Sequence, residues 1–278
     1  MSTETDTRDG GATSAGSLLT VARFEAQRRV RVTAVLAVLF GLFGAIFLWI
    51  APDLVSTGAY DELLETLPPA LTALFGFETF GSVAGVLGGE YYTFTWVVGL
   101  GGYLAYTAAG SVAGDLRTDR MDTLLAAPVS RTSVLYGKYL ALLLPVLALN
   151  VVTPLLLYTE SVLAGSPLPA GNLAALHALS VPYLLCWAAV GLFAGVVVRR
   201  GRTASRAALG TVVAAWLVES VVVETDIEFL GAFSPMRYFS PSTVLVDGSY
   251  DLLGAGVLLA TTAVVLLASL LVFQRSDL

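Results

Sequence analysis

Six long apolar runs, separated by short polar segments, limit the fold of this chain of 278 residues more than any other feature. A helix rises about 1.5 Å per residue, so about 20 residues cross the roughly 30 Å of hydrocarbon in a bilayer. The sequence therefore predicts an all-α integral membrane protein with six transmembrane helices. We place the spans at roughly 33–51, 94–113, 139–158, 178–198, 207–223 and 252–273.

The basic residues predict the orientation of these helices, because Lys and Arg gather in the cytoplasmic segments of membrane proteins. With the N-terminus inside the cell, fourteen of the 15 basic residues fall in inner segments and Arg237 alone falls outside. An odd number of spans would destroy this alternation between basic inner segments and outer segments with almost no basic residues. We therefore expect both termini to be cytoplasmic in a multi-pass protein of the plasma membrane.

Composition argues against several other classes of protein. The chain is 56% apolar and 13% charged, whereas a soluble domain needs about 25% charged residues to cover its surface. The net charge of −6 argues against nucleic acid as a partner. Cys186 and His177 are the single residues of their types, which leaves no internal disulfide and little for a metal centre. We expect both to be packing or interface residues, with His177 near the outer end of the fourth span.

The chain has no P-loop for ATP. Lys138 follows Gly137, but Thr132 stands where the first Gly of that motif belongs and Tyr139 replaces its Ser or Thr. No His lies convincingly beside a Ser, as a serine hydrolase requires. We therefore expect neither an enzyme nor a cofactor bound by this chain.

The N-terminal segment divides into two parts. Residues 1–16 are polar and predict a disordered tail, and 17–278 are expected to form one six-span transmembrane domain. Within that domain, 17–31 combine a modest apolar stripe with a basic cluster. This pattern indicates an amphipathic helix on the inner membrane surface, or a basic cluster that only sets topology, and both interpretations stay open.

The first outer segment is semi-apolar and rich in glycine. Gly81, Gly85 and Gly89 follow one another at four-residue spacing, which favours the close approach of a second helix. Residues 70–93 fit a re-entrant segment, an interfacial helix or an early start of the second span, and the sequence does not choose among these.

Glu219 is the one acidic residue well inside an apolar run. A charge at mid-bilayer costs about 2.5 to 3.5 kcal/mol on insertion scales, so this side chain should face the protein interior, pair or be protonated. It lies about one turn from the predicted outer end of its span, however. We therefore favour an interface role over a place in a transport path.

The inner segment between the second and third spans predicts a short amphipathic helix over 116–127. Its apolar residues cluster on one side and its charged residues ring the rest. Pro128 then forces a turn, and Ser130 or Thr132 is expected to cap the helix that enters the third span. A rigid knob is thus predicted on the inner face, although a plain connector has the same pattern.

Three stretches of the sequence resemble those of one family. The inner segment ends in LLAAPVSRTSVLYGK at 124–138, AGD stands at 113–115, and FSPMRYFSPSTVLVDG stands at 233–248. The chain is thereby similar to ABC-2-type transport permeases, the membrane subunits of ATP-binding-cassette transporters. These carry Leu-Leu-small-small-Pro-Val-Ser-Arg before Gly-Lys, Ala-Gly-Glu after the second span, and Ser-Pro-x-x-Tyr before the sixth. Asp119 departs from the pattern, since many members have Gly there.

The resemblance implies the permease of an ABC transporter, most simply an exporter. A second permease copy or a homologous permease would complete a dimer, a cytoplasmic P-loop ATPase would bind ATP and Mg, and membrane lipid would surround the pair. The 17–31 helix would resemble the family's elbow, and 116–127 its coupling helix. Residues expected at the ATPase contact are Leu116, Arg117, Asp119, Arg120, Met121, Asp122, Leu124, Leu125, Pro128, Ser130 and Arg131. Candidate residues of a translocation path or outer gate are Glu219, Pro235, Arg237 and Tyr238.

One alternative comes from another class, a self-contained secondary transporter or channel driven by ion gradients. That function calls for polar or charged residues along several spans, and only Glu219 offers itself. The sequence names no substrate, and the direction of transport follows from family analogy alone. The segment at 233–248 also fits a plain structured outer loop.

Overall fold

The computed structural model describes residues 9–57, 66, 81–117, 130–198, 200–222 and 228–275, and every regular element in these ranges is helical. The longer helices are α1 (Asp9–Gln27), α2 (Val30–Ser56), α6 (Gly101–Arg117), α8 (Arg131–Leu140), α9 (Leu143–Leu163), α10 (Ala170–Val197), α11 (Gly201–Val222) and α13 (Leu252–Gln274). The shorter ones are α5 (Val83–Val86), the π-helices η2 (Leu87–Tyr91) and η3 (Thr93–Leu100), the 3-10 helices η4 (Glu228–Phe233) and η5 (Pro235–Tyr238), and α12 (Pro241–Asp247).

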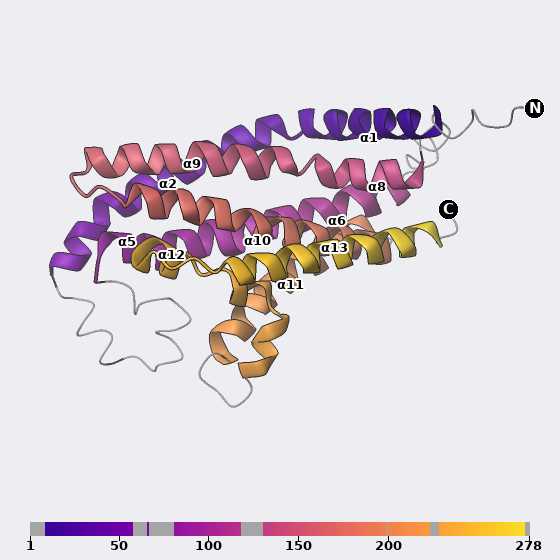
Figure 1. The fold of residues 1–278 in the computed structure, drawn as a ribbon. Helices are drawn as coiled ribbons and strands as arrows, with labels where there is room; N and C mark the ends of the chain where they lie inside the picture. The colour runs from indigo at the N-terminus through magenta and orange to yellow at the C-terminus, as the bar shows by residue number, and fades with distance from the viewer. Residues whose placement is uncertain are drawn as a thin grey trace, which may run out of the picture.

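Five helical stretches are long and apolar enough to cross a membrane: α2, α8 with α9, α10, α11 and α13. They contain or largely overlap five of the six predicted spans, so the chain is a multi-pass membrane protein. The remaining prediction, 94–113, is divided between η3 and α6, and neither is long enough alone. Figure 1 shows the long helices side by side in an elongated bundle.

One side of the bundle pairs α1 with α8 and α2 with α9 (Figure 1). α1 and α8 run in parallel, because Ser17 contacts Ser133 and Glu25 contacts Lys138 further along both helices. Glycines allow close approach: a Cβ at Gly44 would overlap Leu157 of α9.

The start of the chain differs from the prediction at both ends of α1. The helix begins at Asp9, inside the stretch expected to be a polar tail, and ends at Gln27. Helix formation is cooperative, so the residues that pack on α8 favour helix in the turns before them. A turn at Arg28 and Arg29 then separates α1 from α2, and it divides the predicted 17–31 helix.

The centre of the bundle is α6, which packs against α10 on one side and α11 on another. Two Ala–Gly contacts bring α6 and α10 together backbone to backbone. A Cβ at Gly191 would lie 2.6 Å from Cα of Ala105, and one at Gly195 would lie 2.9 Å from Cα of Ala109. Small residues at four-residue spacing therefore hold these helices closer than larger side chains would allow.

The segment before α6 is an early start of the same helical run. Helical residues continue through α5, η2 and η3 into α6, which identifies 83–93 with one of the three predicted alternatives. The glycine in close contact here is Gly88, where a Cβ would lie 2.8 Å from Cα of Ser242 in α12. Gly81, by contrast, faces open space. Residues 70–80 lie outside the described part of the chain.

A buried polar network joins this helical run to α9 and α10. His177 Nε2 lies 2.9 Å from the Tyr92 hydroxyl, and His177 Nδ1 lies 3.0 Å from Asn150 Oδ1. Ser180 donates to the same Asn150 oxygen at 2.7 Å and accepts from the Trp96 indole at 3.0 Å. His177 is therefore a packing residue within α10, and Cys186 is likewise buried, as expected.

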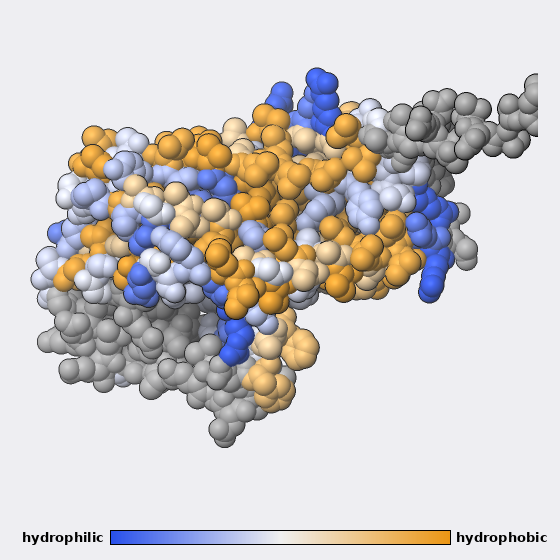
Figure 2. Space-filling model, in the orientation of Figure 1, coloured by the Kyte–Doolittle hydropathy of each residue, from blue (hydrophilic) through white to orange (hydrophobic). Residues whose placement is uncertain are grey.

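Apolar side chains cover much of the face shown in Figure 2, over the long helices of the bundle. Across the bundle, Leu155 of α9 and Val264 of α13 are among the large apolar residues that are exposed, at 63% and 65%. Water would not solvate a surface this apolar, so lipid or another protein subunit covers it.

Candidate functional site

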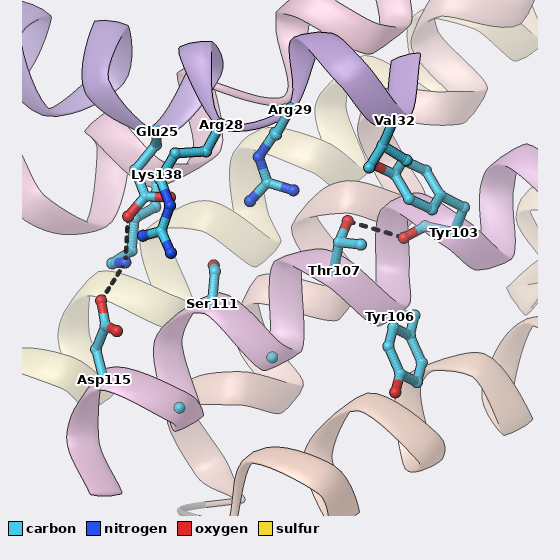
Figure 3. A pocket seen from close by; sticks show the side chains of 12 residues that line it. Glu25, Arg28, Arg29, Val32, Tyr103, Tyr106, Thr107, Ser111, Asp115 and Lys138 are labelled. Atoms are coloured by element: carbon cyan, nitrogen blue, oxygen red, sulfur yellow. Dashed lines mark hydrogen bonds and ion pairs between the residues drawn. The ribbon is translucent and has the colours of Figure 1, made fainter. Parts of the chain in front are cut away.

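The most distinctive charged cluster lies where α1, α6 and α8 meet (Figure 3). Lys138 of α8 has a side chain only 1% exposed, and its Nζ lies 2.6 Å from Oδ2 of Asp115 in α6 and 3.2 Å from Oε1 of Glu25 in α1. A buried ammonium needs such partners, since an unpaired charge in this environment costs several kcal/mol. One lysine thus joins three helices.

Local sequence explains why α8 begins where it does. Ser130 is the N-cap, and its hydroxyl accepts from the backbone N–H of Ser133 at 3.0 Å. This confirms Ser130 as one of the two predicted caps. Further along, Gly137 lets α1 approach, because a Cβ there would lie 2.9 Å from Cβ of Val21. The cap and the glycine together fix the direction in which Lys138 points.

Arg131 ties the start of α8 to the end of the chain. Its guanidinium donates to the carbonyls of Phe273 at 3.5 Å and Gln274 at 3.3 Å, at the C-terminus of α13. Helix C-termini leave carbonyls without helical partners and favour cations. The start of α8 therefore holds α1, α6 and α13 at one end of the bundle, called the basic end below.

The structure describes the residues at the two ends of the predicted coupling segment. Leu116 and Arg117 are the last two residues of α6, and Ser130 and Arg131 open α8. The other predicted contact residues lie outside the described part of the chain: Asp119, Arg120, Met121, Asp122, Leu124, Leu125 and Pro128. Their role as a coupling helix stays a prediction.

A cavity of about 540 Å³ opens beside Lys138. Figure 3 shows Arg29 pointing from the turn between α1 and α2 toward Thr107 and Ser111 of α6, whereas Arg28 from the same turn lies nearer Glu25 and Lys138. Nε of Arg29 is buried, and no hydrogen-bond partner for it is present in the described ranges. The cavity thus combines three cationic side chains, two carboxylates and hydroxyl groups.

Two of the predicted gate residues, Glu219 in the last turn of α11 and Arg237 in η5, come together near one glycine. A Cβ at Gly231 of η4 would lie 2.5 Å from Oε2 of Glu219 and 2.6 Å from Nη1 of Arg237 in η5. The carboxylate and the guanidinium therefore converge on one glycine. Glu219 is half-buried and Arg237 is exposed, so water reaches this cluster.

The two remaining gate candidates shape this outer segment. Pro235 opens η5, where its fixed φ suits the first helical position. Tyr238 donates its hydroxyl to the carbonyl of Ala232 at 2.9 Å, which closes η4 onto η5. Arg237 and Tyr238 also line a hollow of about 210 Å³ beside Asp251, the N-cap of α13.

Reasoning from the sequence missed the Lys138 cluster. Lys138 was considered only for its place after Gly137, and Asp115 only for its place after Ala-Gly. One signal was present: the chain has a single Lys among its 15 basic residues, and it stands at the predicted inner end of a span. Nothing in the sequence pointed to Glu25, because it pairs with Lys138 across 113 positions.

Within the described ranges, no group of three or more His, Cys, Asp or Glu side chains is placed to hold a metal ion. A family model described as "ABC-2 family transporter protein" matches residues 19–278. No curated protein gives a significant match to the chain.

Proposed function

Because the chain belongs to the ABC-2 transporter family, we propose that it is the membrane-spanning permease subunit of an ABC transporter, driven by a separate cytoplasmic ATPase. The family match carries this proposal, since it covers nearly the whole chain. Such a subunit is a transport component and not itself a catalyst. ATP and Mg would bind to the partner ATPase, and the substrate would leave the cell.

We place six spans in the plasma membrane, with both termini in the cytoplasm. The span at 94–113 supplies the sixth: η3 and α6 follow each other without a break, and α10 and α11 enclose α6. Protein contacts on two sides explain why this span is less apolar than the others, since little of it would face lipid. Six spans also preserve the alternation of the basic residues.

The coupling mechanism that we propose depends on α6 and α8, the helices on either side of the predicted coupling helix at 116–127. ATP-driven closure of the ATPase pair would push this segment, which joins the end of α6 to the start of α8. Asp115 near the end of α6 pairs at 2.6 Å with Lys138, two turns into α8, so the two helices would move together. Displacement of α6 would then tilt the helices packed on it, and the different affinities of the two conformations for ATP would drive the change.

At the C-terminal end of α11, Glu219 and Arg237 would form part of an outer gate. Their convergence at Gly231 supports this, because a small displacement of α11 against η5 would separate the two charges. A second permease copy, or a homologous permease, would complete the path between subunits.

The decisive experiment is affinity purification from mild detergent after co-expression with candidate P-loop ATPases. We expect one ATPase to co-purify, and Asp122→Arg or Arg120→Glu to weaken its binding without loss of membrane insertion. Arg206→Glu is the matched control, because Arg206 is exposed in α11 and lies outside the predicted contact. Transport by the purified chain without nucleotide would instead identify a self-contained transporter.

Topology is tested separately with Ser130→Cys in a chain whose Cys186 is replaced by Ala. A membrane-impermeant maleimide should label Ser130→Cys only from the cytoplasmic side. Labelling from the outside would overturn the proposed orientation.

A further inference from the structure

The cavity at the basic end contains an excess of positive charge. Lys138 is matched by Glu25 and Asp115, which leaves the two arginines of the turn between α1 and α2. Neither Arg28 nor Arg29 has an acidic partner within 4.0 Å in the described ranges; Arg28 lies 5.8 Å from the ring centroid of Phe24. The lining therefore carries three cationic and two anionic side chains, a net positive charge of one.

The donors around this cavity suit a phosphate group. Figure 3 shows Arg29 extending from above toward Thr107 and Ser111, whose hydroxyls lie on the α6 side. Both hydroxyls donate within α6, Thr107 to the carbonyl of Tyr103 and Ser111 to that of Ala108, each at 2.8 Å. The arginines therefore supply the free donors, and arginine binds phosphate through several parallel N–H groups. The buried Nε of Arg29 is one donor still to be satisfied. The site therefore has the chemistry of an anion pocket.

The surroundings select an amphiphile over a soluble anion. Val32, which lines the cavity, is itself 45% exposed, and the same helix continues with Val35 and Leu42 exposed at 57% and 60%. Acyl chains would cover this apolar surface, while a phosphate at its base reaches the arginines. Basic pockets at the cytoplasmic level of membrane helices bind anionic headgroups in this way.

We propose that the cavity between the α1–α2 turn and α6 is a binding site for the phosphate of an anionic phospholipid in the inner leaflet, with Arg28 and Arg29 as the principal ligands. The lipid would hold the α1–α2 turn against α6, next to the Lys138 ion pairs that line the same cavity. This proposal does not depend on the ATPase or on the direction of transport.

The test is a titration of the delipidated full chain with phosphatidylglycerol, followed by native mass spectrometry. The double variant Arg28→Gln with Arg29→Gln should weaken the first bound lipid by roughly tenfold or more. Arg23→Gln with Arg31→Gln is the matched control: it removes the same charge from exposed positions outside the cavity, and it should leave the first lipid bound. Ser111→Phe should also prevent binding, because it fills the cavity and keeps every charge.

Several outcomes would overturn the proposal. If both double variants lose lipid binding equally, the lipid is attracted to a basic surface in general. If phosphatidylcholine binds as tightly as phosphatidylglycerol, the site does not select for an anionic headgroup. Displacement of the lipid by millimolar inorganic phosphate would identify a soluble anion as the ligand. Dissociation of a dimer in the Arg28 and Arg29 variant would assign the cavity to a second copy of the chain. If that variant does not fold, Ser111→Phe alone decides the question.

Discussion

Replacing Lys138 with Met should destabilise the protein by about 3 kcal/mol. The ammonium is almost completely buried and contacts two carboxylates, whose side chains are 13% and 16% exposed. Loss of one partner from a buried ion pair costs roughly 3 to 5 kcal/mol, because the remaining charge stays uncompensated. Here two carboxylates remain, and partial access to water places the expected cost toward the lower end of that range.

The geometry also predicts an order among the single variants. Asp115→Asn should cost more than Glu25→Gln, because the Nζ–O distances are 2.6 and 3.2 Å, and both should cost less than Lys138→Met. Each acidic variant leaves the lysine with one partner. A variant that neutralises all three positions should recover part of the stability, since no charge is then left unpaired.

Unfolding by titration with SDS, followed by tryptophan fluorescence, measures these free energies. Deuterium uptake of α1 provides a local readout, because α1 should exchange faster once Glu25 loses its partner. Arg206→Gln, an exposed basic residue of α11, is the control and should change the free energy of unfolding by less than about 0.5 kcal/mol. If Lys138→Met unfolds like the wild type, or if Glu25→Gln costs as much as Lys138→Met, the cluster does not join the helices as described.

Three further predictions concern other parts of the molecule. Gly191→Ala should destabilise by about 2 kcal/mol or more, since its Cβ would overlap the α6 backbone, whereas Gly171→Ala in the same helix faces open space and should be nearly neutral in the same titration. Ser130→Ala should cost about 1 kcal/mol through loss of the α8 cap, and increased deuterium uptake confined to the first turn of α8 would show it. Glu219→Gln should slow transport in proteoliposomes and Arg237→Gln should slow it similarly if the two form a gate; unchanged transport in both would remove them from the path.

Hydropathy located most of the helices but not their ends. The fourth span was predicted at 178–198, whereas α10 covers Ala170–Val197. An apolar run marks only the part of a helix that lies in the hydrocarbon. The helix itself continues beyond this run wherever hydrogen bonds and contacts allow. The third span similarly starts before the predicted 139, because Ser130 caps α8 and the helical stretch runs from Arg131.

The sequence alone does not predict which side chains pair across the fold. The polar network of Tyr92, Asn150, His177 and Ser180 comes from three separate helical stretches. Its members look like isolated polar residues in apolar runs, and only the packing of α9, α10 and the helical run before α6 brings their hydrogen-bonding groups together. The same holds for the convergence of Glu219 and Arg237, which requires the fold of η4 and η5 between them.

The segment between α6 and α8 joins two parts of the bundle that are held together by different kinds of contact. α6 packs on α10 through backbone contacts at Ala105 and Ala109, which leave little freedom for one helix to slide on the other. α8 instead meets α6 at the basic end through Lys138 and Asp115. In the proposed mechanism, a push on this segment would reach both parts at once, and the ion pair would decide whether they move as one body. Loss of the pair would leave the ATPase bound but let α8 yield independently of α6, so ATP hydrolysis would continue while transport falls.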